Sequence, residues 1–132
     1  MGGMTADEIK KLKKKIYKKT RASMEEVGTF RPEFDPTVER YAELRAQFQE
    51  LNQQWYDSGC QITEEYTNKA GATNKRKTAL YLALEALRKE LTEMENIFGL
   101  TPKGLKGIKA KALNAAKGTK LDAALEAMND SG

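Results

Sequence analysis

Two stretches of similar length carry apolar residues at heptad spacing, and they constrain the fold more than any other feature of the sequence. The apolar residues recur at intervals of 3, 4, 3 and 4 between residues 36 and 57, and of 4, 3, 4 and 3 between residues 78 and 98. This spacing places one apolar stripe along each of two helices about 30 Å long. The stripes comprise Tyr41, Leu44, Phe48, Leu51 and Trp55, and Leu80, Leu84, Leu87, Leu91 and Met94. The matched lengths predict an all-α fold built on a long antiparallel helical hairpin.

Capping signals mark the ends of these helices. Asp35 is a candidate N-cap, with Pro36 at the first helical position of the first helix. The second helix is expected to run from Thr78 to Phe98, because Gly99 can end it in the left-handed region.

The connection over residues 58–77 is longer than the ~2 to 8 residues that usually join two helices. The segment CQITEEYT is rich in strand-forming residues, and NKAG is a good turn. We therefore expect a short β-hairpin arm, with an irregular loop as the alternative.

The second helix also carries apolar residues outside its stripe, namely Tyr81, Leu82 and Ile97. They can be covered by an N-terminal helix, by the C-terminal segment or by further copies of the chain. The segments that offer apolar residues for this are Ile9, Leu12 and Ile16, and Leu121, Leu125 and Met128. Because a thin two-helix unit gains most by association, we expect an oligomer with Leu82 at a contact.

A short basic helix is expected after the hairpin, from Pro102 to about Leu113, with Thr101 as its cap. Two glycines, Gly104 and Gly107, should weaken it by roughly 1 kcal/mol each relative to alanine. The predicted organisation is a basic N-terminal helical arm (1–27), a helical-hairpin oligomerisation core (28–99), and a basic short helix with a C-terminal tail (100–132).

Positive charge is concentrated at both flanks of the chain, although its net charge is only +4. Residues 1–21 hold eight lysines and arginines against two acids, and residues 98–120 hold six lysines and no acid. This segregation suits a polyanionic partner, and solvated helix faces are the equally weighted alternative. The candidate DNA-binding residues are Lys10, Lys11, Lys13, Lys14, Lys15, Lys18, Lys19, Lys69, Lys75, Arg76, Lys77, Lys103, Lys106, Lys109 and Lys111.

The sequence contains no recognisable catalytic or metal-binding motif. The chain has one cysteine, Cys60, and no histidine, so the usual metal-ligand clusters are missing. Gly99 and Gly104 have the glycine spacing of a phosphate-binding loop, but the required Lys-Ser/Thr does not follow. We therefore predict neither enzyme activity, cofactor nor metal. The absence of a long apolar run and of a signal sequence predicts a soluble intracellular protein.

Three segments in collinear order resemble one family: GTFRPEFDPTVERYAEL, EEYTNKAGATNKRKTALYLALEALRKEL and FGLTPKGLK. Over residues 28–109 the sequence is similar to the small subunit of tailed-bacteriophage terminase, in the branch found in phages and prophages of Gram-positive bacteria. The resemblance implies a non-catalytic DNA-packaging factor in the bacterial cytoplasm. It further implies a ring-like homo-oligomer that recognises the packaging-initiation site on viral DNA and brings it to the large subunit, the ATPase and nuclease.

Two other classes stay open from the sequence alone: a histone-like architectural DNA-binding protein, and a helical adaptor or scaffold with no nucleic-acid role. A helix-turn-helix with residues 102–113 as recognition helix is less favoured, because that helix lacks the Arg, Asn and Gln that usually read bases. We also expect that residues 1–21 can be removed without loss of the helical fold, since the heptad stripes lie elsewhere.

Overall fold

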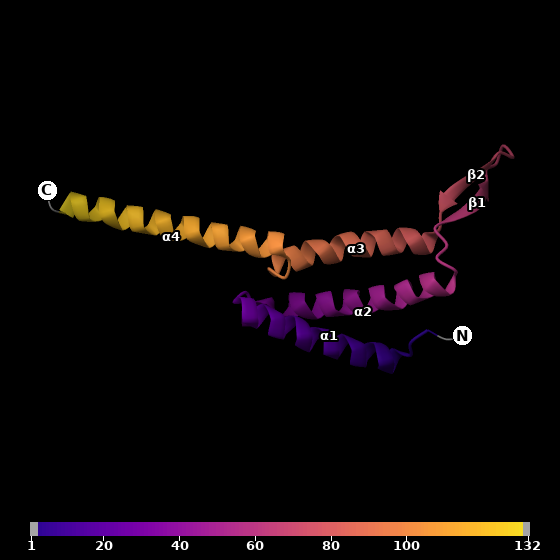
Figure 1. Ribbon diagram of the computed structural model, residues 1–132, viewed down its shortest axis with the longest axis horizontal. Helices are drawn as coiled ribbons and strands as arrows, with labels where there is room; N and C mark the ends of the chain where they lie inside the picture. Colours follow the sequence, from indigo (N-terminus) through magenta and orange to yellow (C-terminus); the bar gives the residue numbers. More distant parts are fainter. Residues whose placement is uncertain (1–2, 131–132) are drawn as a thin grey trace.

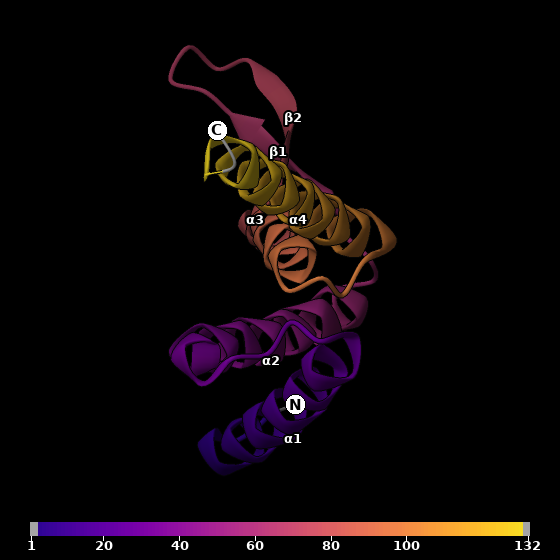
Figure 2. The ribbon, with the colours of Figure 1, turned by 90° about the vertical axis from the view of Figure 1, so that its left-hand side faces the viewer.

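The computed structural model describes residues 3–130 as a mostly helical chain with one small sheet. Helices α1, α2 and α3 stack side by side with α2 in the middle (Figures 1 and 2). A β-hairpin projects from one end of this stack, and α4 extends from the other. In chain order the elements are α1 (Ala6–Val27), the 3₁₀ helix η1 (Pro32–Phe34), α2 (Asp35–Asp57), β1 (Thr63–Thr67), β2 (Thr73–Lys77), α3 (Ala79–Ile97) and α4 (Pro102–Asp130).

The core joins all three stacked helices. It consists of Met24 from α1, Val38 and Tyr41 from α2, Leu91 and Met94 from α3, and Phe98 just after α3. Of the predicted stripes, Tyr41, Leu84, Leu91 and Met94 are buried, and Leu44, Phe48, Leu51, Trp55, Leu80 and Leu87 are half-buried. Leu82, which was predicted outside the stripe, is exposed. The mainly helical fold is confirmed.

Helix α1 packs along α2 and contributes to the core, which a separate arm would not do. Its buried side consists of Thr20 and Met24, with Ile16 and Tyr17 packed against the core cluster. The heptad stripes do lie outside residues 1–21, but removal of these residues would also strip the packed contacts of Ile16, Tyr17 and Thr20 from the fold.

The middle position of α2 explains a second buried stripe that the heptad pattern does not contain. Val38, Ala42 and Ala46 follow one another at four-residue spacing and have no exposed surface. Small side chains at this spacing let neighbouring helices approach closely on a second side of α2.

The helix ends agree with some of the capping signals and correct others. The Thr78 hydroxyl accepts a hydrogen bond from the backbone N–H of Tyr81 and caps α3, and Gly99 follows that helix with φ +74°. Asp35 is not an N-cap: it is the first residue of α2, and one of its carboxylate oxygens accepts a hydrogen bond from the Tyr17 hydroxyl.

The largest error in a predicted helix boundary concerns α4. This helix continues to Asp130 and does not end near Leu113. The alanine-rich sequence after residue 109 favours helix and contains no proline, so the single Gly118 does not interrupt it. The predicted apolar residues on its far half, Leu121, Leu125 and Met128, are exposed and do not cover α3.

The long connection forms a two-stranded antiparallel sheet, as the strand and turn signals predicted. Strands β1 and β2 pair with Glu64 opposite Arg76 and Glu65 opposite Lys75. The turn is closed by Asn68, whose side-chain oxygen accepts hydrogen bonds from the backbone N–H groups of Ala70 and Ala72. Gly71 supplies the positive φ of +87° that this turn requires.

Candidate nucleic-acid interface

The lysines of α1 lie on the side of the helix that the bundle leaves free. Lys14 and Lys15 lie three and four residues after Lys11, and Lys18 lies four and three residues after them; all four are exposed. This spacing places them on one helix face, opposite the half-buried Ile9 and Ile16 and the buried Thr20. We call these four residues the α1 lysine face. Among the described residues, none of the four has an ion pair.

The remaining basic residues of α1 lie beside this face. Lys10 and Lys19 are exposed, and Lys13 is half-buried with its ammonium 3.9 Å from the carboxylate of Glu43. Lys10, Lys13 and Lys14 line a shallow groove together with Tyr17 and Glu39. The hydrogen bond to Asp35 raises the pKa of Tyr17 further above neutral pH, where a phenol carries no charge.

The basic residues of the β-hairpin are largely engaged within the chain. The Arg76 side chain donates a 3.0 Å hydrogen bond to Glu64 and its guanidinium lies 4.2 Å from the centre of the Tyr66 ring. The Lys77 ammonium lies 2.8 Å from one Glu85 oxygen and donates to the other at 3.2 Å, and this contact raises the pKa of Lys77. Lys77 therefore holds the arm on α3, whereas Arg76 stabilises the hairpin itself, and both side chains already have acidic partners.

The two other basic residues of the hairpin differ from this pair. Lys69 lies in the exposed turn, and Lys75 lies opposite Glu65 in the strand register. Neither has an ion pair among the residues that the structure describes.

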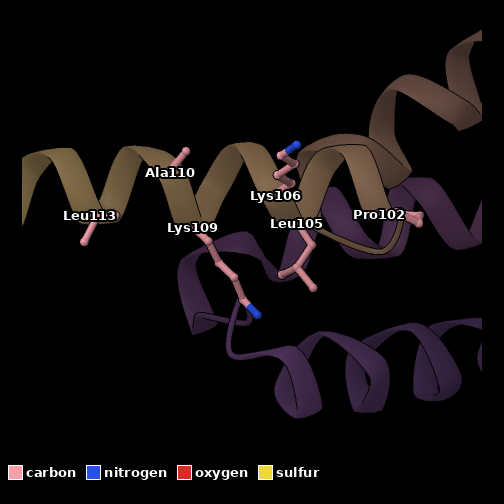
Figure 3. A pocket seen from close by; sticks show the side chains of 6 residues that line it. All are labelled: Pro102, Leu105, Lys106, Lys109, Ala110 and Leu113. Atoms are coloured by element: carbon pink, nitrogen blue, oxygen red, sulfur yellow. The ribbon is translucent and has the colours of Figure 1, made fainter.

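The start of α4 carries a second free group of lysines, Lys103, Lys106, Lys109 and Lys111, all of them exposed. The Thr101 hydroxyl caps this helix by accepting a 3.0 Å hydrogen bond from the N–H of Gly104. An open groove follows, lined by Pro102, Leu105, Lys106, Lys109, Ala110 and Leu113. In Figure 3 the side chains of Leu105, Lys109 and Leu113 point to one side of α4, while Lys106 and Ala110 point to the other.

Gly104 has a role at this junction that the sequence did not reveal. A Cβ atom at this position would lie 2.2 Å from the backbone oxygen of Asn96 in α3. The absence of a side chain therefore lets α4 start directly against the end of α3. In the sequence Gly104 appears only as a glycine near the start of a helix, and we predicted that it weakens that helix.

The three basic groups lie on different parts of a single chain. The α1 lysines lie on one of the two outer helices of the stack, the hairpin projects from one end and α4 leaves from the other (Figure 1). One copy therefore does not gather them into one cleft. Over residues 3–130 no cluster of three or more acidic, histidine or cysteine residues could hold a metal ion. In the same range no helix is long and apolar enough to cross a membrane.

Comparison with known proteins places the sequence in a family. The family model described as phage terminase, small subunit, matches residues 14–114, most of the chain. The chain belongs to the phage terminase small subunit family. The resemblance seen over residues 28–109 is confirmed, and the match extends past it on both sides. Neither the curated proteins nor the solved structures contain a match to this chain.

Membership of the terminase small subunit family supports a role in phage DNA packaging, alongside the large terminase subunit and phage DNA. The family match includes most of the α1 lysine face, all of the hairpin lysines and the four lysines at the start of α4, but it ends before the distal half of α4. Small subunits of this family are typically non-catalytic. The assignment to the branch from Gram-positive hosts stays a prediction.

Proposed function

We propose that this small subunit binds double-stranded phage DNA at the packaging-initiation site and delivers it to the large subunit, which carries the ATPase and nuclease. The observation that carries the proposal is the α1 lysine face, because its four ammonium groups are exposed and have no ion pair in the described part of the chain. Lysines at helical spacing are suited to backbone phosphates, which position a protein on DNA. The α4 lysines supply a second contact of the same chemistry.

The structure changes the relative weight of the predicted DNA-binding residues. Arg76 and Lys77 already interact with Glu64 and Glu85, so phosphate binding there would break existing contacts. Lys13 is likewise close to Glu43. We therefore assign the main affinity to the α1 lysine face and to Lys103, Lys106, Lys109 and Lys111, with Lys69 and Lys75 as lesser contacts.

The proposed function also requires that copies of the chain associate with one another. The exposed side chain of Leu82 and the exposed apolar residues of distal α4 support contacts between copies, and we propose a homo-oligomer in the form of a ring. Repetition of weak phosphate contacts around such an assembly gives avidity without strong binding by any one copy. The protein would act in the cytoplasm of the bacterial host and perform no catalytic step itself.

The test compares two variants that remove equal charge from different surfaces. One replaces Lys11, Lys14, Lys15 and Lys18 by Gln, and the other replaces Lys103, Lys106, Lys109 and Lys111 by Gln. Binding to packaging-site DNA is measured by gel shift across a salt series. Each lost phosphate contact should lower the slope of log affinity against log salt by about 0.9, and the α1 variant should lose more.

Three outcomes separate the function classes. Preference for packaging-site DNA over competitor DNA supports the proposal, whereas equal binding of both supports an architectural DNA-binding protein. Absence of binding to either supports a helical adaptor. Unaltered affinity and slope in both lysine variants would show that DNA recognition does not use these surfaces.

A further inference from the structure

The β-hairpin leaves both of its strand edges open. Asn68 N–H donates to Ala72 C=O at the turn end, and Thr78 N–H donates to Ile62 C=O at the other end. Pairs in an antiparallel ladder alternate between bonded and non-bonded, so the intervening bonded pairs are Glu64 with Arg76 and Tyr66 with Asn74. The backbone groups that point outward therefore belong to residues 63, 65 and 67 on β1, and to residues 73, 75 and 77 on β2.

An isolated two-stranded hairpin is only marginally stable, and open edges are templates for pairing with another strand. Every residue of both strands is exposed except Glu64, which is half-buried. Of the outward groups, the Thr63 carbonyl accepts a hydrogen bond from the Gln61 side chain, which leaves the stretch around Glu65 open on the β1 edge. The hairpin is thus built like part of a larger sheet.

The two strands carry opposite charges. When two hairpins pair, these charges favour contact between unlike strands. Strand β1 carries Glu64 and Glu65, whereas β2 carries Lys75, Arg76 and Lys77. Pairing β1 with β1 or β2 with β2 of a second copy would place like charges opposite one another, which is destabilising. Pairing β1 of one copy with β2 of the next places glutamates opposite lysines.

We propose that β1 of one copy pairs antiparallel with β2 of the next, so that the hairpins of successive copies form one continuous sheet. This contact is heterologous, because two different edges meet, and repeated heterologous contacts close into a ring when the rotation between copies permits. The inference deepens the self-association proposed above by naming a surface, and it does not require DNA binding.

Apolar side chains near the base of the hairpin can extend the same contact. Tyr56 at the end of α2, Ile62 before β1 and Leu82 at the start of α3 are large and exposed. They lie on the elements that meet at this end of the molecule (Figure 1). Their burial between copies would add apolar area to the backbone hydrogen bonds of the sheet.

The first test blocks the edges and leaves the hairpin ladder intact. Proline lacks a backbone N–H, and the N–H groups of residues 65 and 75 point away from the partner strand, so Glu65→Pro and Lys75→Pro should be tolerated within the hairpin. Glu65→Ala and Lys75→Ala are the matched controls, because they remove the same side chains but keep the outward N–H. The native mass of the full chain is measured without DNA, with circular dichroism as the check on folding.

We expect both proline variants to fall in native mass while both alanine variants retain the larger assembly. If folded proline variants keep the wild-type mass, the lysines on this edge serve only to keep it from pairing, and the inference is wrong. Leu82→Asp separates pairing of the hairpin edges from self-association in general. If only this variant has a lower native mass, the chain still self-associates, but the contact lies on the helices.

The second test does not depend on how proline is tolerated. The double variant Glu65→Lys with Lys75→Glu keeps opposite charges within its own hairpin and between its own copies. Copies of the variant should therefore assemble with one another but co-assemble several-fold less with wild-type chains carrying a different tag. Random mixing of the two chains would overturn the inference.

Discussion

The hydroxyl of Thr29 donates a 2.7 Å hydrogen bond to the backbone carbonyl of Phe98. Thr29 lies in the turn after α1, and Phe98 follows the last residue of α3, so this bond joins two elements that are distant in sequence. Carbonyl groups at the end of a helix have no partner within it, and this bond satisfies one of them. It fixes the place where α1 and α3 meet beside the core.

Thr29→Val should therefore destabilise the fold while keeping the shape of the side chain. We expect a loss of about 1 to 2 kcal/mol in the free energy of unfolding, because a half-buried carbonyl is left without its donor. Thr92→Val is the control: its hydroxyl bonds only to the Arg88 carbonyl within α3 and is exposed, so its effect should stay within about 0.5 kcal/mol. Urea unfolding measures both, and equal effects would contradict the role of Thr29.

Tyr41 predicts a loss of stability at alkaline pH. Its hydroxyl donates a 3.0 Å hydrogen bond to Glu95, and burial followed by the nearby carboxylate raises the pKa of Tyr41 from 10.0 to about 12. Since the folded pKa lies above the unfolded one, the contribution is complete below pH 10 and disappears as the pH rises through 12. This contribution to the free energy of unfolding amounts to roughly 3 kcal/mol.

Urea unfolding between pH 8 and 12 measures this loss. Tyr41→Phe should be less stable than wild type at pH 8 by about 1 kcal/mol, since Glu95 loses its donor, but it should lack this alkaline decline. Tyr66→Phe, at an exposed position on the hairpin, should keep it. A decline of the same size in Tyr41→Phe would assign the alkaline loss to another group.

The sequence predicted the elements whose signals are local. Heptad spacing located the stripes of α2 and α3, of which Leu84 and Leu91 are nearly inaccessible. Strand-forming residues and a turn located the hairpin, and Thr101 and Pro102 located the start of α4. Each of these signals depends on a few neighbouring residues, so it can be read without knowing what packs against them.

The parts that were missed depend on contacts between distant segments. Ala42 and Ala46 are too small to stand out in a heptad pattern. The sequence therefore predicted neither the second buried side of α2 nor the packing of α1 along it. The lysines between Ile9 and Ile16 made α1 look like a solvated arm, although one apolar side is enough to pack it. The ion pair between Lys77 and Glu85 likewise joins a strand to a helix, and no local spacing predicts it.

The two glycines at the start of α4 should respond in opposite ways to alanine. At Gly107 a Cβ would have no neighbour within 4 Å, so Gly107→Ala should stabilise the chain by about 0.5 to 1 kcal/mol through helix propensity. At Gly104 the Cβ would collide with the Asn96 backbone, so Gly104→Ala should destabilise it by about 1 to 3 kcal/mol. Thermal unfolding measures both, and stabilisation by Gly104→Ala would show that α4 does not need this close approach.

We expect no nucleotide hydrolysis by the purified protein, because the sequence lacks the glycine, lysine and hydroxyl pattern of a phosphate-binding loop. Phosphate release is measured with ATP and Mg²⁺, with and without added large subunit. Activity should follow the large subunit only. A steady rate that survives further purification and disappears on a point substitution in this chain would contradict the prediction.

Two leucines of α3 separate folding from assembly. Leu91 is 2% exposed and belongs to the core, whereas Leu82 is 53% exposed at the start of the same helix. Leu91→Asp should unfold the chain, because a buried charge without a partner costs several kcal/mol. Leu82→Asp should leave the circular dichroism spectrum unchanged and reduce the native mass, since the charge disfavours burial of that surface between copies. A folded Leu82→Asp variant at wild-type mass would place the contact between copies elsewhere, with the hairpin edges and the exposed leucines of distal α4 as the remaining surfaces.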